Sequence, residues 1–193
     1  FGTYGQLAAD RGWGAPVRED VRASRIVCLD PFFDDASLQV ADWCIEGDIP
    51  YVTVDVVPDS RIARHAAAVV VSEEFAVARL GMSDGIADAR RVLGDYTAGC
   101  QGLVVLTRGH RRLLSGRPNE PAREHEPVVV EARDTTGAGD SFRAGVIFGL
   151  LQGLDDDRLV HTASALAAMV CKQIPSVLHS PTATELAAFL TTP

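Results

Sequence analysis

The stretch Asp134-Thr-Thr-Gly-Ala-Gly-Asp-Ser-Phe142 leads from a loop into a strongly apolar segment that continues to about Gly153. Apolar residues recur at helical spacing in that segment, so we expect a helix that begins inside the stretch. The first backbone N–H groups of a helix have no partner within it and lie at the positive end of its dipole. Because small residues let an anion approach those amides, the turn predicts a site for a phosphate or a developing oxyanion.

Asp140 is an acid placed inside this turn. A carboxylate there could accept a proton from an attacking hydroxyl while the amides of Gly137, Ala138 and Gly139 hold the transferring phosphoryl group. The alternative is an ordinary early-helix acid that only interacts favourably with the helix dipole. The pattern alone leaves both interpretations open.

Outward from this turn, short apolar runs alternate with longer amphipathic ones. Parallel strands need crossover connections, and helices are the natural crossover, so the alternation favours a parallel sheet. We therefore predict a single α/β domain over residues 1–193, with three layers (αβα) and a mainly parallel central sheet. The expected strands are 25–30, 51–57, 67–71, 102–107, 112–114 and 128–130; the expected helices are 36–47, 73–80, one capped by Ser83 or Asp84, one from the turn to about Gly153, 156–172 and 182–190.

Composition and charge narrow the function classes. The 193 residues are 47% hydrophobic and 23% charged, as in ordinary globular proteins. The net charge of -8 disfavours nucleic acids and anionic membranes as partners, and the basic run His110-Arg-Arg112 is too short to change that. No apolar run reaches the length of a membrane span, and no signal-peptide pattern opens the chain. We expect a cytoplasmic protein.

The four cysteines, Cys28, Cys44, Cys100 and Cys171, are far apart in the sequence. They form no CxxC motif and have no histidine at zinc-ligand spacing. Free thiols, mostly buried, are therefore favoured over metal or redox roles.

The 134–142 stretch, followed by Ala144-Gly145, is similar to the C-terminal signature of the ribokinase-like (PfkB) carbohydrate kinases, D-T-x-G-A-G-D-x-F-x-A-G. This resemblance implies that Asp140 is the base that activates a sugar hydroxyl, in contact with the substrate. It implies that Gly137, Ala138 and Gly139 form the anion hole, and that ATP and Mg²⁺ are the cofactors. The alternatives are a nucleoside kinase of the same family and a nucleotide- or sugar-binding module without turnover.

Two further segments extend the resemblance to the nucleotide. Thr107 and Gly109 are similar to the family's T-x-G turn after a core strand, which helps to bind ATP, although Arg112 stands where a further glycine is expected. The predicted helix 156–172 occupies the place of the helix that closes over adenine, which implies Ser164 and Ala168 as pocket lining. An ordinary turn and core packing are the respective alternatives.

The chain departs from the family at the N-x-x-E motif that organises the magnesium shell, because Ser72 and Phe75 occupy those positions. Glu73 or Glu74 could compensate, but we expect both to be surface helix acids, and we assign no metal ligand. Ketohexokinase-type members are similar at Val71-Ser72 and at Val146-Ile-Phe148, which favours a ketose substrate.

Two acids, Asp30 at the end of the predicted strand 25–30 and Asp55 in the predicted strand 51–57, could face a cleft at the carboxyl end of the sheet. Capping of the following turn is the alternative, which we prefer for Asp30. The resemblance covers about 24–190, whereas family members run about half as long again. The first strands, the sugar-binding signature and the β-lid, which often forms a homodimer interface, have no counterpart here. We expect a fragment of a working kinase, since Asp140 and its turn are intact; the chain opens at Phe1, not Met, with no recognisable strand in 1–13.

Overall fold

In the computed structural model, which describes residues 15–178 and 180–191, six strands form one sheet in the order β1-β2-β3-β4-β5-β6. The first four run parallel to one another, and the last two are antiparallel to their neighbours. This arrangement confirms the prediction of a mainly parallel sheet. The strands are β1 (Val27–Leu29), β2 (Tyr51–Val54), β3 (Ala68–Ser72), β4 (Leu103–Thr107), β5 (Leu113–Gly116) and β6 (Arg123–His125).

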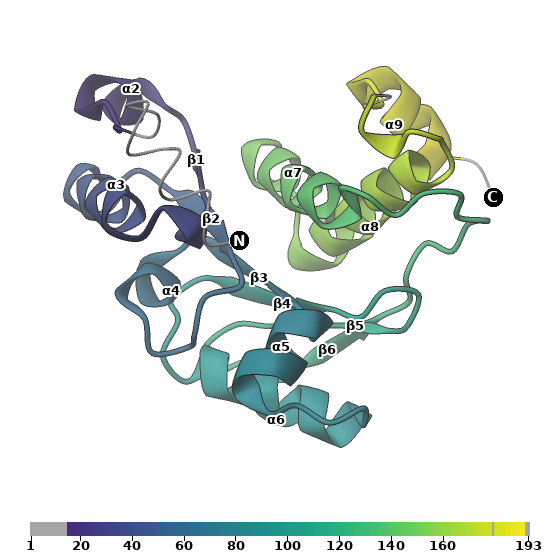
Figure 1. The fold of residues 1–193 in the computed structure, drawn as a ribbon, viewed down its shortest axis with the longest axis horizontal. Coiled ribbons are helices and arrows are strands. Elements are labelled where there is room, and N and C mark those ends of the chain that lie inside the picture. Colours follow the sequence, from purple (N-terminus) through teal and green to yellow (C-terminus); the bar gives the residue numbers. More distant parts are fainter. Residues whose placement is uncertain (1–14, 179, 192–193) are drawn as a thin grey trace.

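Helices cover both faces of the sheet and complete the three layers (Figure 1). One face packs against the helices α3 to α6, and the other packs against α7 and α8, with α9 beside α8. A further helix, α2, lies against α3. The helices are α2 (Arg18–Ala23), α3 (Asp34–Gly47), α4 (Arg61–His65), α5 (Glu73–Leu80), α6 (Ile86–Thr97), α7 (Ala138–Leu151), α8 (Asp156–Cys171) and α9 (Ala183–Leu190), with 3-10 turns η1 (Pro31–Phe33) and η2 (Ser176–Leu178).

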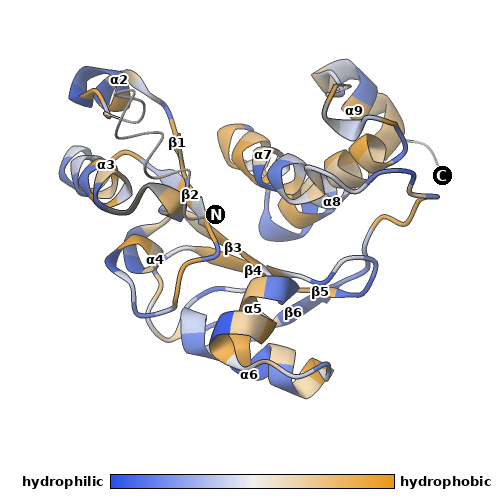
Figure 2. Cartoon of the chain, in the orientation of Figure 1, coloured by the Kyte–Doolittle hydropathy of each residue, from blue (hydrophilic) through white to orange (hydrophobic). Residues whose placement is uncertain are grey.

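The central strands are apolar along their whole length because both of their faces are buried. In β3, Val69 and Val71 belong to the core under α3 to α6, whereas Ala68 and Val70 belong to the core under α7 and α8. Side chains of a strand alternate between the faces, so a continuous apolar run supplies both cores. Figure 2 shows β2, β3 and β4 as mostly hydrophobic between helices that carry many hydrophilic residues.

The two helices on the second face approach each other closely through glycines of α7. A Cβ at Gly145 would lie 2.5 Å from the Cα of Ala163, and one at Gly149 would lie 2.7 Å from the Cγ of Leu159. Real Cβ atoms do not approach other atoms so closely, so larger residues at these positions would push α7 away from α8.

Three predicted details are wrong, and each has a local reason. The last strand is β6, not 128–130; its charged residues suit a sheet edge, while the backbone N–H of Val128 donates to Ser164 Oγ at 2.8 Å. Neither Ser83 nor Asp84 caps α6, which starts after Gly85 without a side-chain cap. The short helices α2 and α4 were not predicted, because neither is long enough to show an apolar period.

The remaining expectations about composition are placed as follows. Cys44, Cys100 and Cys171 are buried and Cys28 is exposed, and all four are free thiols. Within 15–178 and 180–191, no helix has the length and apolar character needed to cross a membrane. The opening segment 1–13 lies outside the described residues.

Candidate active site

The turn that opens α7 places the predicted anion-binding amides at the start of that helix. Gly137 is the N-cap and has a φ of 75°, a left-handed conformation that glycine adopts without steric cost. The N–H of Ala138 donates to the carbonyl of Thr135 at 3.1 Å, so it is used inside the turn. No hydrogen bond among the described residues engages the amides of Gly137, Gly139 and Asp140. These three amides are therefore available to an anion, whereas the amide of Ala138 is not.

Gly139 has no packing reason to be glycine. A Cβ built at this position would meet no atom of the described residues within 4 Å. Alanine is the better helix former, so packing and propensity together would favour a side chain here. The absence of one keeps the surface of the first turn low beside the available amides.

Asp134 ties the turn to a segment that follows α8. Its carboxylate accepts hydrogen bonds from the backbone N–H of Ser176 at 3.0 Å and from that of Thr136 at 2.9 Å. These two bonds lower the pKa of Asp134 to about 2. Ser176 Oγ, which is buried, also donates to the carbonyl of Thr136 at 2.5 Å. The turn therefore depends on contacts with residues about 40 positions away.

Asp140 lies in the first turn of α7, and its side chain is 78% exposed. Its Oδ1 accepts a hydrogen bond from Arg143 at 3.0 Å. Another nitrogen of the same guanidinium lies 3.4 Å from Oδ2 of Asp30, just after β1. Asp30 also accepts from the N–H of Phe32 at 3.0 Å, which confirms the predicted capping role, but the ion pair to α7 was not predicted.

Asp55 and Ser72 form a second polar pair at the ends of β2 and β3. Asp55 has a left-handed φ of 47°, and its carboxylate accepts from the N–H and the hydroxyl of Ser72 at 2.7 and 2.9 Å. Burial raises the pKa of Asp55, and the two bonds from Ser72 act in the opposite direction. Ser72 Oγ also accepts from the N–H of Phe75 and so caps α5. Ser72, which departs from the family's N-x-x-E motif, therefore links the end of β2 to the start of α5.

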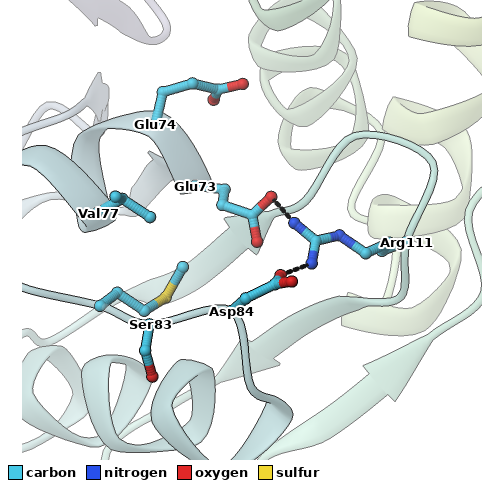
Figure 3. A pocket seen from close by; sticks show the side chains of 7 residues that line it. Glu73, Glu74, Val77, Ser83, Asp84 and Arg111 are labelled. Atoms are coloured by element: carbon cyan, nitrogen blue, oxygen red, sulfur yellow. Dashed lines mark hydrogen bonds and ion pairs between the residues drawn. The ribbon is translucent and has the colours of Figure 1, made fainter.

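Glu73 is not the surface acid that we expected. Its side chain is only 16% exposed and is paired with Arg108 at 3.1 Å and with Arg111. Arg108 is itself 5% exposed and donates to the backbone carbonyl of Asp84, whose carboxylate pairs with Arg111. Figure 3 shows Glu73 and Asp84 converging on Arg111, at a hollow of about 630 Å³. Glu74, in contrast, is exposed as expected.

The remaining predicted nucleotide residues differ in burial: Ser164 and Ala168 are buried, Thr107 is half-buried and Gly109 is exposed. Thr107 Oγ donates to the carbonyl of Val71 at 3.3 Å, and Gly109 follows Arg108 with a left-handed φ of 60°. On α8, Ser164 and Ala168 are each 6% exposed. The alternatives of an ordinary turn and of core packing account for these contacts, and the nucleotide roles stay predictions.

These groups share one edge of the sheet. Because β1 to β4 are parallel, their carboxyl ends meet at the same edge, where ligands of open α/β sheets bind. The ion pair between Asp30 and Arg143 brings the start of α7 to this edge. The polar residues at or just after these strand ends are Asp30, Asp55, Ser72 and Thr107.

Comparison with known proteins agrees with this arrangement. The pattern of the pfkB family carbohydrate kinase matches residues 27–183, which include all the predicted site residues. The chain belongs to this family. An uncharacterized sugar kinase of Dictyostelium discoideum is 47% identical over 60 residues, which are 30% of this chain and 16% of that protein.

Solved structures show the same fold. Ribokinase of Arabidopsis thaliana, complexed with ribose and ATP, superposes with a TM-score of 0.78 at 20% identity, over 91% of this chain and 59% of that one. A nucleoside kinase of Burkholderia thailandensis, in complex with ADP-inosine, gives 0.72 at 17% identity, over 92% and 56%. This pfkB chain therefore spans a little more than half the length of these proteins.

Sequence reasoning missed Arg143, the residue that pairs with both Asp30, after β1, and Asp140, in the first turn of α7. The family signature leaves this position open, between the phenylalanine and the alanine. A signal was nevertheless present, because residues three apart on a helix are neighbours, and Arg143 follows Asp140 by three. Its second partner, Asp30, is 113 residues away and could not be found from spacing.

Proposed function

We propose that this chain carries the ATP-binding and phosphoryl-transfer part of a sugar kinase. The observation that carries the proposal is the first turn of α7, where Asp140 lies exposed beside backbone amides to which none of the described residues is hydrogen-bonded. Amides at a helix start can hold the γ-phosphoryl oxygens. Asp140 can take the proton of the sugar hydroxyl while the hydroxyl oxygen attacks the γ-phosphorus, and the bond from that phosphorus to the β–γ bridging oxygen breaks so that ADP leaves. Of the predicted anion hole, we retain Gly137 and Gly139 and add the amide of Asp140.

The residues present fit Mg²⁺ bound together with ATP. Mg²⁺ is usually held by phosphates, waters and one or two carboxylates, so no complete protein cage is required. Among the described residues no cluster of three acids, histidines or cysteines occurs. Glu74 is exposed at the start of α5, where it can take a water-mediated place, whereas Glu73 is already paired with two arginines. Bound Mg²⁺ would neutralise charge on the transferring phosphates.

A binding module without turnover is the second candidate. Its specific support is the ion pairing of Glu73, since no acid stands at the family's N-x-x-E glutamate position and this neighbour is not free to replace it. A nucleoside kinase is the third, and its choice of substrate depends on parts of the fold that this chain does not span.

One assay separates these candidates. ADP release should be followed with fructose, ribose and adenosine, for the protein made from its complete reading frame and for its Asp140→Asn variant. Loss of the base should lower turnover by about 10² to 10⁴ while leaving the melting temperature unchanged, because the side chain is 78% exposed.

Asp157→Asn is the matched control. Asp157 is also an exposed, ion-paired acid in the first turn of a helix, and its loss should leave turnover unchanged. Undiminished turnover of Asp140→Asn would contradict the catalytic role. ATP binding without turnover on any acceptor would favour the binding module, and turnover with adenosine alone would favour the nucleoside kinase.

A further inference from the structure

The ion-paired chain Asp30–Arg143–Asp140 crosses from the end of β1 to the start of α7. We propose that Arg143 is a positioning residue: it fixes the carboxylate of Asp140 so that Oδ1 is occupied and Oδ2 is left to accept the proton of the substrate hydroxyl. This inference rests on the proposed function for its catalytic consequence. Its structural content, a single orientation of Asp140, can be tested separately.

An exposed aspartate needs such help. Asp140 is 78% exposed, so packing does not restrict its rotamers, and its only hydrogen bond among the described residues comes from Arg143. Arg143 is only 14% exposed, so its own position is restricted by its surroundings. A partly buried guanidinium that holds an exposed carboxylate restricts the orientation of the reacting group.

Asp30 completes the arrangement by holding the guanidinium from the other side. Its Oδ2 lies 3.4 Å from one terminal nitrogen of Arg143, while the other terminal nitrogen lies 3.0 Å from Asp140. Asp30 is fixed in turn by the N–H of Phe32, which donates to Oδ1. The orientation of Asp140 is therefore restrained by β1, a strand of the central sheet, as well as by α7.

Binding of an anionic substrate group by Arg143 is the competing interpretation. Both terminal nitrogens already donate to carboxylates, and two carboxylates with one guanidinium leave a net charge of −1. Such a group repels a phosphate or a carboxylate. Charge therefore favours positioning over substrate binding.

The first test compares Arg143→Met with Arg117→Met in the protein made from its complete reading frame. Arg117 is a matched control, since it also loses a partly buried ion pair, to Asp156 at 2.7 and 2.8 Å, away from the site. We expect Arg143→Met to lower kcat about tenfold with KM values changed less than about threefold, because misplacing a catalytic group costs rate more than binding. Arg117→Met should leave kcat unchanged. Arg143→Lys should recover part of kcat, since one ammonium can still reach Asp140.

Asp30→Asn is the second variant, in case Arg143→Met does not fold. The asparagine oxygen can still accept from Phe32, so the turn is kept while the charge facing Arg143 is removed. We expect kcat to fall about threefold at unchanged KM. Unchanged kcat in folded Arg143→Met or Asp30→Asn, or a rise in sugar KM alone, would overturn the inference.

A crystal structure of each variant tests the inference without activity. Asp140 should occupy one rotamer in the parent protein and more than one in Arg143→Met. A single, unchanged rotamer in the variant would overturn the positioning role even if the kinase assay succeeds. If no acceptor is phosphorylated but the rotamers spread, the proposed function fails and the positioning role stands.

Discussion

The two halves of α7 use glycine for opposite reasons. In the middle of the helix, a Cβ at Gly145 would collide with the backbone of α8, whereas at Gly139, in the first turn, it would meet no described residue within 4 Å. Gly145 is needed so that α7 and α8 can touch, and Gly139 leaves space that the described part of the chain does not fill. The difference teaches that a glycine-rich motif can hold a packing part and a ligand part, which the sequence pattern does not distinguish.

The largest effect is expected from Gly145→Ala. The added methyl group must displace α8 because its nearest neighbour, at 2.5 Å, is backbone, so we expect a loss of about 2 kcal/mol in the free energy of unfolding. Urea denaturation measures this loss. Gly94→Ala, in an exposed and open position of α6, is the control and should stabilise the protein by about 0.5 kcal/mol. Equal effects of the two substitutions would break the comparison.

A smaller, purely functional effect is expected from Gly139→Ala. The melting temperature should stay the same or rise, because alanine forms helix better and has room. The methyl group narrows the approach of phosphate to the amides, so kcat/KM for ATP should fall about tenfold, as when one such interaction is weakened. Steady-state kinetics at saturating sugar measures it, with Gly94→Ala as control. An unchanged kcat/KM would contradict the proposed role of Gly139 in ligand binding.

The pH dependence of Asp134 tests how the first turn is held. Its folded pKa, about 2, is below the unfolded value, so its contribution to stability is present above about pH 4 and is lost as the pH falls towards 2. Asp134→Asn should therefore melt at a lower temperature than the parent protein at pH 7, and the gap should narrow below about pH 4 and close only as the pH falls to about 2 and below. A gap that does not depend on pH would show that the charge of Asp134 does not hold the turn.

The smallest effect is expected from Thr107→Val, at the last residue of β4. Its hydroxyl makes one long hydrogen bond, of 3.3 Å, to Val71, so stability should change by less than about 1 kcal/mol. If Thr107 also binds ATP, the KM for ATP should rise by no more than about threefold. A larger rise would place Thr107 beside the first turn of α7 in importance, and no change would leave it a structural residue.

Features that depend on neighbouring residues in the sequence could be predicted, and pairings between distant residues could not. β3 and β4 were predicted correctly because burial on both faces leaves a continuous apolar run. Asp140 could be proposed as a site residue because its motif is contiguous, and its role stays a prediction. β6 was missed because Arg123, Glu124 and His125 give no apolar signal; their register is set by pairing with β5. The burial of Glu73 was missed because it depends on a distant ion pair, with Arg108, which lies 35 residues away.

The hydrogen bonds of the Asp134 segment have a consequence for local unfolding of the protein. The N–H groups of Arg133 and Asp134 both donate to the carbonyl of Cys171, and Ser176 donates to Asp134, so the polypeptide before α7 is bonded to the polypeptide after α8. The α7–α8 hairpin is thus closed into a loop at its open end. Its hydrogen-bonded amides should exchange with solvent as one cooperative unit, more slowly than those of the short α4, and in the turn that opens α7 the hydrogen-bonded amides of Thr136 and Ala138 should share that protection.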